Sequence, residues 1–176
     1  MIDTKTKIAA GLERAFASQG FAEPSVEDLR DAAGVSLRTL YKYTPSRSEM
    51  VHAALDHRHR RYLAHMFDDL PETPWDALSA LMDRVGSWMT LESSHGCLFH
   101  AAVAAAPGDT RLHELLQSHK AEVAFRSAAA LHLVGHETEV MIILEGLTQS
   151  WPLHGDSAVQ AAKHLGAALM RETVPV

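Results

Sequence analysis

The chain has little of what marks secreted, membrane-bound or disulfide-stabilised proteins. Cys97 is the one cysteine among 176 residues, so an intramolecular disulfide is impossible and a reducing compartment is expected. No stretch approaches the roughly 18 consecutive apolar residues of a membrane span. The first residues follow an amphipathic pattern with Lys5 and Lys7, and they lack the apolar core of a signal peptide. We therefore expect a cytoplasmic protein with no membrane partner.

The sequence also lacks the strict alternation of apolar and polar residues that marks half-buried strands, and it has no internal repeats. Aromatic residues make up only 6% of the chain, whereas hydrophobic residues make up 47%. The apolar positions recur with the helical period of about 3.6 residues. We predict an all-α protein of about nine helices, divided into domains at residues 1–48 and 49–176.

Gly and Pro residues, together with capping residues, delimit the predicted helices. A first helix ends at Gly20, and two short helices follow before Pro45. The segment that starts at His95 is apolar on nearly all sides, so we expect it to be buried. The later helices are predicted from Ser46 to about Asp69, from Pro74 onward, from His95 to Ala106, from Asp109 to Val134, over 137–151 and over 157–172.

The charges are distributed unevenly along the chain. The net charge is -6, yet residues 1–65 carry ten Lys or Arg against eight Asp or Glu. Residues 66–176 hold six basic and fourteen acidic residues, a net charge of -8. Local potential matters more than total charge when a protein approaches a polyanion. The N-terminal part is therefore the part suited to bind nucleic acid.

The pattern of residues 25–43 predicts two short helices joined by a tight turn. Ser25 is placed to cap the first helix, with Asp28 in its first turn, where the helix dipole favours a carboxylate. Gly34 can adopt the positive φ that ends such a helix, and Ser36 caps the next one. A helix, a short Gly-containing turn and a second helix form the helix-turn-helix pattern, whose second helix enters the DNA major groove.

The second short helix presents a polar, cationic face. Leu37 and Leu40 are expected to face inward, which leaves the other side chains outward: Arg38, Thr39, Tyr41, Lys42 and Tyr43. Ser46 and Glu49 then predict a reciprocal capping box at the start of the fourth helix. Arg47 falls in its first turn, beside backbone N–H groups that can bind an anion.

Four motifs in this region resemble the DNA-binding domain of the TetR (tetracycline repressor) family over residues 8–55. They are Ala-Phe-Ala-Ser-Gln-Gly-Phe at 15–21, Ser-Val-Glu-Asp-Leu at 25–29, Ala-Gly-Val-Ser-Leu-Arg-Thr-Leu-Tyr-Lys-Tyr at 33–43 and Pro-Ser-Arg-Ser-Glu-Met at 45–50. The family usually has Phe before the Pro, where this chain has Thr44. We expect this change to loosen the packing between the third and fourth helices.

The resemblance implies a ligand-responsive transcriptional regulator, a repressor, that binds a palindromic operator. Arg38 would read a base, since Arg bonds bidentately to guanine. Phosphate contacts would come from the other residues of this DNA-binding set: Ser25, Ser36, Thr39, Tyr41, Lys42, Tyr43 and Arg47. Neither a cofactor nor a metal is implied.

The resemblance also implies a homodimer through the last two helices and a small apolar effector in the C-terminal domain. The predicted effector site lies between the fourth and eighth helices. Its candidate lining residues are Trp75, Met82, Trp88, Met89, Leu98, Phe99, His100, Phe125 and Trp151. The same apolar residues are also what a plain helical core would contain.

Three alternatives remain at this point. The C-terminal domain could serve dimerisation alone, giving a constitutive DNA-binding dimer. A helical enzyme is a weaker alternative, because the sequence has no nucleophile elbow, HExxH or paired-Cys motif. Sensing by Cys97 or by a metal at His132 and His136, or at His95, Cys97 and His100, is disfavoured, since neither set supplies a full group of ligands.

Overall fold

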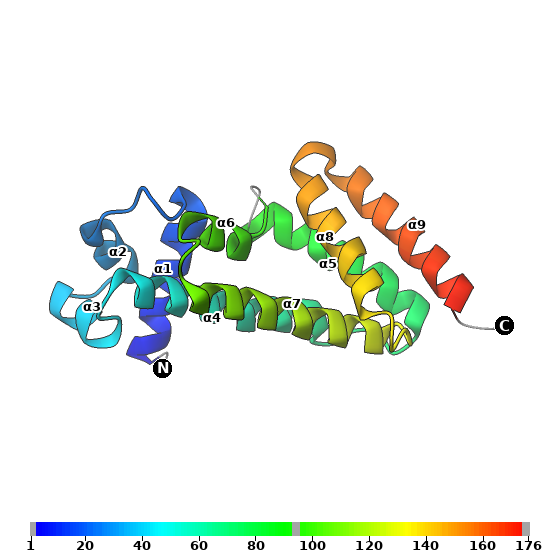
Figure 1. Cartoon of the computed structure of the whole chain (residues 1–176), viewed down its shortest axis with the longest axis horizontal. Coiled ribbons are helices and arrows are strands. Elements are labelled where there is room, and N and C mark those ends of the chain that lie inside the picture. Colours follow the sequence, from blue (N-terminus) through cyan, green and yellow to red (C-terminus); the bar gives the residue numbers. More distant parts are fainter. Residues whose placement is uncertain (1–2, 93–95, 174–176) are drawn as a thin grey trace. The chain divides into compact units, whose positions relative to one another are not determined.

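The computed structural model describes residues 3–92 and 96–173, and the secondary structure in these ranges is helical with no strand (Figure 1). Nine helices occur in this part of the chain, which confirms the predicted all-α class. They are α1 (Thr4–Gln19), α2 (Val26–Ala33), α3 (Leu37–Tyr43), α4 (Arg47–Phe67), α5 (Pro74–Glu92), α6 (Leu98–Ala105), α7 (Thr110–Ala130), α8 (Glu137–His154) and α9 (Asp156–Thr173). None of these helices is long and apolar enough to span a bilayer.

The helices group into two compact units. The first unit contains the residues up to Tyr62 together with Leu98–Leu116. The second contains Leu63–Cys97 and the residues from Gln117 onward. Helices α4 and α7 therefore each contribute residues to both units. The grouping of α6 and the start of α7 with the N-terminal helices was not among the sequence predictions.

The first unit has a small core centred on α1. Ile8, Leu12 and Phe16 form the predicted helical stripe of α1, and each is at most 1% exposed. The ring of Phe21 stacks on Phe16 with 5.0 Å between centroids, beyond the end of the helix. Gly11 allows α1 and α2 to touch, since a Cβ at this position would lie 2.5 Å from Ala33 Cα.

The second unit packs α5 against α8 and α9, which run side by side in opposite directions (Figure 1). Close approach again depends on glycine, because a Cβ on Gly86 of α5 would lie 2.7 Å from Val159 of α9. The core side chains of this unit are almost all apolar, and they include Met66, Leu78, Leu81, Met82, Val85, Met89, Leu131, Leu144 and Leu147.

Three predictions about the later helices need correction. The segment after Cys97 is not buried on nearly all sides: Leu98, Phe99 and Ala102 are buried in α6, but most of its alanines are exposed. Small Ala side chains tolerate either environment, so an Ala-rich run does not indicate burial by itself. Helix α7 ends at Ala130 rather than Val134. Leu131 and Leu133, each 1% exposed, are buried by a turn instead.

The third correction concerns the helix predicted over 137–151, which was expected to end before Pro152. Helix α8 continues through this proline to His154. A proline removes one backbone donor and its ring crowds the carbonyl four residues earlier, yet α8 continues for two residues beyond it. The helix ends at Gly155, which has φ 51° and donates its N–H to the Trp151 carbonyl at 2.8 Å. Asp156 accordingly lies in the first turn of α9.

Candidate nucleic-acid interface

Helix α2 begins with the capping box that the sequence predicts. The Ser25 hydroxyl accepts from the Asp28 N–H at 3.2 Å, while the Ser25 N–H donates to the Asp28 carboxylate at 2.8 Å. The Ser25 hydroxyl also donates to that carboxylate at 2.6 Å. These bonds satisfy backbone groups that a helix start leaves free, so an eight-residue helix has a defined N-terminus.

The turn between α2 and α3 is fixed by a left-handed glycine. Gly34 has φ 62° and ψ 42°, a region that residues with a Cβ rarely adopt. The Lys7 ammonium of α1 donates to the Gly34 carbonyl at 2.8 Å, and this bond links α1 to the turn. Ser36 then caps α3, accepting from the Thr39 N–H at 3.1 Å. The turn thus sets the direction of α3.

Helix α3 presents a polar face to solvent. Leu40 is fully buried, whereas Leu37, which we expected to be buried, is 38% exposed. The other candidate side chains on α3 are exposed, with Tyr41 at 42% and Tyr43 at 40%, except for the half-buried Thr39. The Lys42 ammonium lies 5.6 Å from the centre of the Tyr43 ring, a cation–π contact. The exposed face of α3 is therefore cationic and rich in hydroxyl groups.

Arg47 has a different environment from the predicted anion site. Its guanidinium donates to the carbonyls of Pro24 at 2.9 Å and Phe21 at 2.8 Å, and it lies 5.8 Å from the centre of the Phe16 ring. These bonds tie the start of α4 to the loop before α2. Arg47 therefore links the start of α4 to this loop, and its side chain remains exposed.

The start of α4 differs in two further details from the sequence prediction. Ser46 accepts from the Glu49 N–H at 3.2 Å, but the Glu49 carboxylate bonds to Arg111 and does not close the predicted capping box among the described residues. Thr44, where we expected looser packing between the third and fourth helices, is 4% exposed. Its hydroxyl donates to the Leu40 carbonyl at 2.9 Å, which satisfies the hydroxyl at the end of α3.

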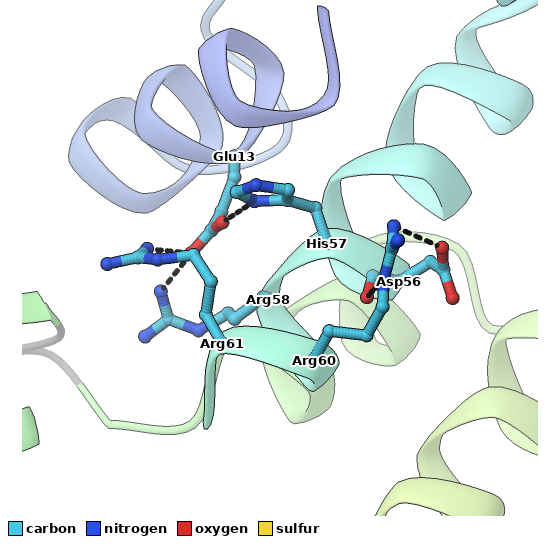
Figure 2. A network of polar contacts seen from close by, with 6 residues as sticks. All are labelled: Glu13, Asp56, His57, Arg58, Arg60 and Arg61. Atoms are coloured by element: carbon cyan, nitrogen blue, oxygen red, sulfur yellow. Dashed lines mark hydrogen bonds and ion pairs between the residues drawn. The ribbon is translucent and has the colours of Figure 1, made fainter. Parts of the chain in front are cut away.

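A buried carboxylate joins α1 to α4 (Figure 2). Glu13 is 2% exposed, and it accepts from His57 at 2.5 Å, Arg58 at 3.1 Å and Arg61 at 2.8 Å. Arg58 is itself only 3% exposed. Sequence reasoning missed this network. The available signal was that Glu13 follows Ala9 by four residues on the buried side of α1, where an unpaired charge is costly.

Hydrogen bonds to carboxylates make the first unit sensitive to acid. The Ser25 hydroxyl and N–H hold the pKa of Asp28 below its ordinary value, and the Arg111 guanidinium does the same for the pKa of Glu49. A carboxylate whose folded pKa is lowered stabilises the fold above its unfolded pKa, and this stabilisation is lost as the pH falls through the folded value. We predict that stability decreases below about pH 4.5, the ordinary value for Glu.

Urea unfolding followed across pH 3–7 measures this effect. The variant Asp28→Asn should show a shallower loss of stability on acidification than the wild type, because one titrating group is gone. An identical slope for the two proteins would contradict the prediction.

The nine predicted effector-site residues do not share one environment. Leu98, Phe99 and His100 belong to the first unit and the other six to the second. Trp75 is 53% exposed and Phe125 is 63% exposed, whereas Met82, Trp88 and Met89 are buried. Met82 lines a narrow crevice with no room for a water molecule, together with Leu78, Leu131, Leu133, Val140, Ile143, Gly166 and Leu169. Trp151 is half-buried, and its indole N–H is buried with no acceptor among the described residues.

The cysteine and the histidines show no metal-binding arrangement in the described ranges. No group of three or more His, Cys, Asp or Glu side chains there is close enough to hold a metal ion. His132 lies after α7, at φ 56°, and His136 precedes α8, so the two do not share a helix. Cys97 lies 3.4 Å from the Lys120 ammonium, which pairs with Glu145 at 2.5 Å. His95 lies outside the described residues.

Comparison with known proteins agrees with this geometry. Residues 8–54 match the profile of the bacterial regulatory proteins of the tetR family. A TetR-family transcriptional regulator from Streptomyces coelicolor superimposes with a TM-score of 0.82 at 16% identity, covering 96% of this chain and 89% of that one. No curated protein matches the sequence.

Two further solved structures have the same fold. A TetR-family regulator from Rhodococcus sp. gives a TM-score of 0.72 at 21% identity, covering 94% of this chain and 96% of that one. The fatty acid degradation regulator FadR from Bacillus halodurans gives 0.70 at 12% identity, covering 98% and 97%. The family profile falls on the helix-turn-helix described above, and the fold of the whole chain agrees with it. Residues 8–54 therefore match the tetR family of bacterial regulatory proteins, and the chain has the fold of solved TetR-family transcriptional regulators.

Proposed function

We propose that the chain is a cytoplasmic homodimeric repressor that binds a palindromic operator and is released by a small apolar effector. The observation that carries the DNA-binding part is the exposed polar face of α3, held by the left-handed Gly34 turn. A helix of seven residues reaches few base pairs, so a two-fold pair of heads on a palindrome doubles the contact.

In this proposal Arg38 reads a base and its neighbours bind the sugar-phosphate backbone. The exposed guanidinium of Arg38 has the fork geometry that guanine O6 and N7 accept. Lys42, Tyr41 and Tyr43 present an ammonium and two hydroxyls on the same short helix, which suits phosphate oxygens. Ser25, Ser36 and Thr39 lie at the starts of α2 and α3, where helix dipoles favour phosphate. Arg47 supports this surface through its bonds to the loop before α2.

The proposed dimer interface is an apolar groove on α8 and α9. The groove has a volume of about 490 Å³ and is lined by Ile142, Ile143, Gly146, Leu147, Ser150, His154, Ser157, Ala158, Ala161, Ala162 and Leu165. Ile142 is 65% exposed and Leu165 is 59% exposed in the single chain. Exposed large apolar residues around a groove of small residues favour burial against a second copy.

A charge in this groove is expected to separate the dimer. Ile142→Glu should leave the chain folded, because the side chain is 65% exposed, but it would bury an unpaired carboxylate between subunits. Sedimentation equilibrium should show a shift towards monomer. Val134→Glu, at a position 72% exposed in the turn before α8, is the matched control and should sediment as the wild type does. Equal masses for wild type and Ile142→Glu would contradict the proposed interface.

The effector is proposed to enter the second unit. Its interior is almost entirely apolar, and Met82 and Met89 are flexible side chains that can repack around a ligand. The buried indole N–H of Trp151 supplies one unsatisfied donor that an effector's oxygen would satisfy. A structural neighbour of this chain is named as a regulator of fatty acid degradation, which agrees with an apolar effector class. The effector would bind better to a conformation that does not bind the operator.

Selection of bound duplexes from a random DNA pool tests the proposal. We expect an enriched inverted repeat, and a screen of apolar compounds against the selected duplex should yield one that releases the protein. Enrichment of no sequence would refute operator binding. Operator binding with no releasing compound would favour the constitutive dimer.

A further inference from the structure

Leu37 is a large apolar side chain that the fold of the first unit leaves exposed. It is the first residue of α3, and 38% of its surface is accessible, although the sequence pattern placed it inward. The buried side chains of α2 and α3 are Leu29, Ala33 and Leu40, each at most 1% exposed. The interior of the helix-turn-helix is therefore filled without the full burial of Leu37.

The exposed side chains of α3 form two adjacent rows. Residues four positions apart on a helix are neighbours on its surface, so Leu37 lies beside Tyr41, which is 42% exposed. By the same spacing Arg38 lies beside Lys42, and both are exposed. One row is thus apolar and aromatic, and the other is cationic. Binding through phosphates would need the cationic row alone, which leaves Leu37 without a role on this face.

The base edges of the major groove offer one apolar group that suits Leu37. The bases present hydrogen-bond donors and acceptors there, and thymine adds a methyl group at C5. The first residues of a recognition helix are those that contact base edges, and Leu37 begins α3. A leucine placed against a base N–H or C=O would remove its water without replacing the hydrogen bond, which is costly. Placed against a methyl group, the same side chain leaves no polar group unsatisfied.

We propose that Leu37 reads the 5-methyl group of a thymine in each half of the operator. This inference rests on the proposed operator binding, and it adds an apolar contact to the hydrogen bonds proposed for Arg38. The contact selects thymine over cytosine, which carries only a hydrogen at C5. It involves no charge, so it contributes to specificity without contributing to the salt dependence of binding.

Fluorescence anisotropy of the full chain on the selected operator duplex tests the proposal. Each thymine of a half-site is replaced in turn by uracil, which lacks only the 5-methyl group. Because burial of one methyl group strengthens binding about fourfold, replacement of the thymine that Leu37 contacts should weaken wild-type binding about fourfold. Replacement in both half-sites should weaken it about sixteenfold, by the same factor at low and at high salt.

Two variants assign the methyl contact to Leu37. Leu37→Ala shortens the side chain and Leu37→Gln makes it polar, so each removes the apolar contact. The side chain is 38% exposed, and either variant that keeps the wild-type circular dichroism spectrum is sufficient. Each should bind the doubly replaced duplex within about twofold of the thymine duplex. The matched control is Leu91→Ala, at a leucine of α5 that is 77% exposed, and it should keep the full sixteenfold effect.

The outcomes separate the methyl contact from operator binding. A wild type that binds the operator equally well with uracil at every position overturns the contact and leaves operator binding intact. Leu37 variants that lose as much affinity as the wild type on the replaced duplex also overturn it, because another residue or the shape of the DNA would then sense the methyl group. A wild type that enriches no sequence from the random pool refutes operator binding, and the methyl contact with it.

Discussion

Replacing Glu13 with Ala is expected to lower the free energy of unfolding of the first unit by about 3–5 kcal/mol. The carboxylate is 2% exposed and bonds to three basic side chains of α4 (Figure 2). One of these, Arg58, is 3% exposed and would remain as a buried cation without its carboxylate. Breaking a buried pair costs far more than an exposed pair contributes. The loss is a large fraction of the stability of an ordinary domain.

Urea unfolding of Glu13→Ala measures this loss, with Glu23→Ala as the control. Glu23 is an exposed glutamate of the same unit, so its removal should change stability by no more than about 0.5 kcal/mol. Glu13→Gln keeps the shape of the side chain but not its charge, and it should also destabilise. If Glu13→Ala unfolds at the same urea concentration as the wild type, the buried network does not hold α1 to α4.

Replacing Arg38 with Ala is expected to weaken operator binding by about 30-fold or more. A bidentate contact between Arg and guanine contributes roughly 1–3 kcal/mol, and a homodimer would lose one contact in each half-site. The exposed position of Arg38 means that the fold should be unaffected, so a change in affinity reflects a lost DNA contact. The preference for one base pair should also disappear at two positions related by the symmetry of the operator.

Lys42→Ala is the comparison that separates base reading from phosphate binding. Removing a phosphate contact should weaken binding about equally for all operator variants and reduce the salt dependence by about one ion per subunit. Fluorescence anisotropy with single-base operator variants at several salt concentrations measures both proteins. If Arg38→Ala behaves as Lys42→Ala does, Arg38 does not read a base.

Local features of the first unit could be predicted from the sequence because each depends on neighbouring residues. The Ser25 capping box, the left-handed Gly34 and the Ser36 cap all involve groups within a few positions of each other. The helical class follows from periodicity in the same way. The exposed face of α3 was also predicted, since Leu40 defines its buried side.

Features that depend on distant partners were missed or predicted differently. The Glu49 carboxylate has the spacing of a capping box, but an arginine that is 62 positions away binds it. Arg47 has the position of an anion ligand, and its bonds to carbonyls of the loop before α2 could not be predicted from its neighbours. Glu13 occupies an apolar position of α1 because α4 supplies three cationic or imidazole partners. In each case a contact with a residue that is distant in the sequence determines what the side chain binds.

The central claim is that two copies of the α3 face bind the two halves of an inverted repeat. Native mass spectrometry of the protein on its selected duplex tests this claim most directly, together with a duplex in which one half-site is scrambled. We predict two chains on each intact duplex, and a large loss of affinity for the scrambled one. One chain bound to the intact duplex, or equal affinity for both duplexes, would contradict the account.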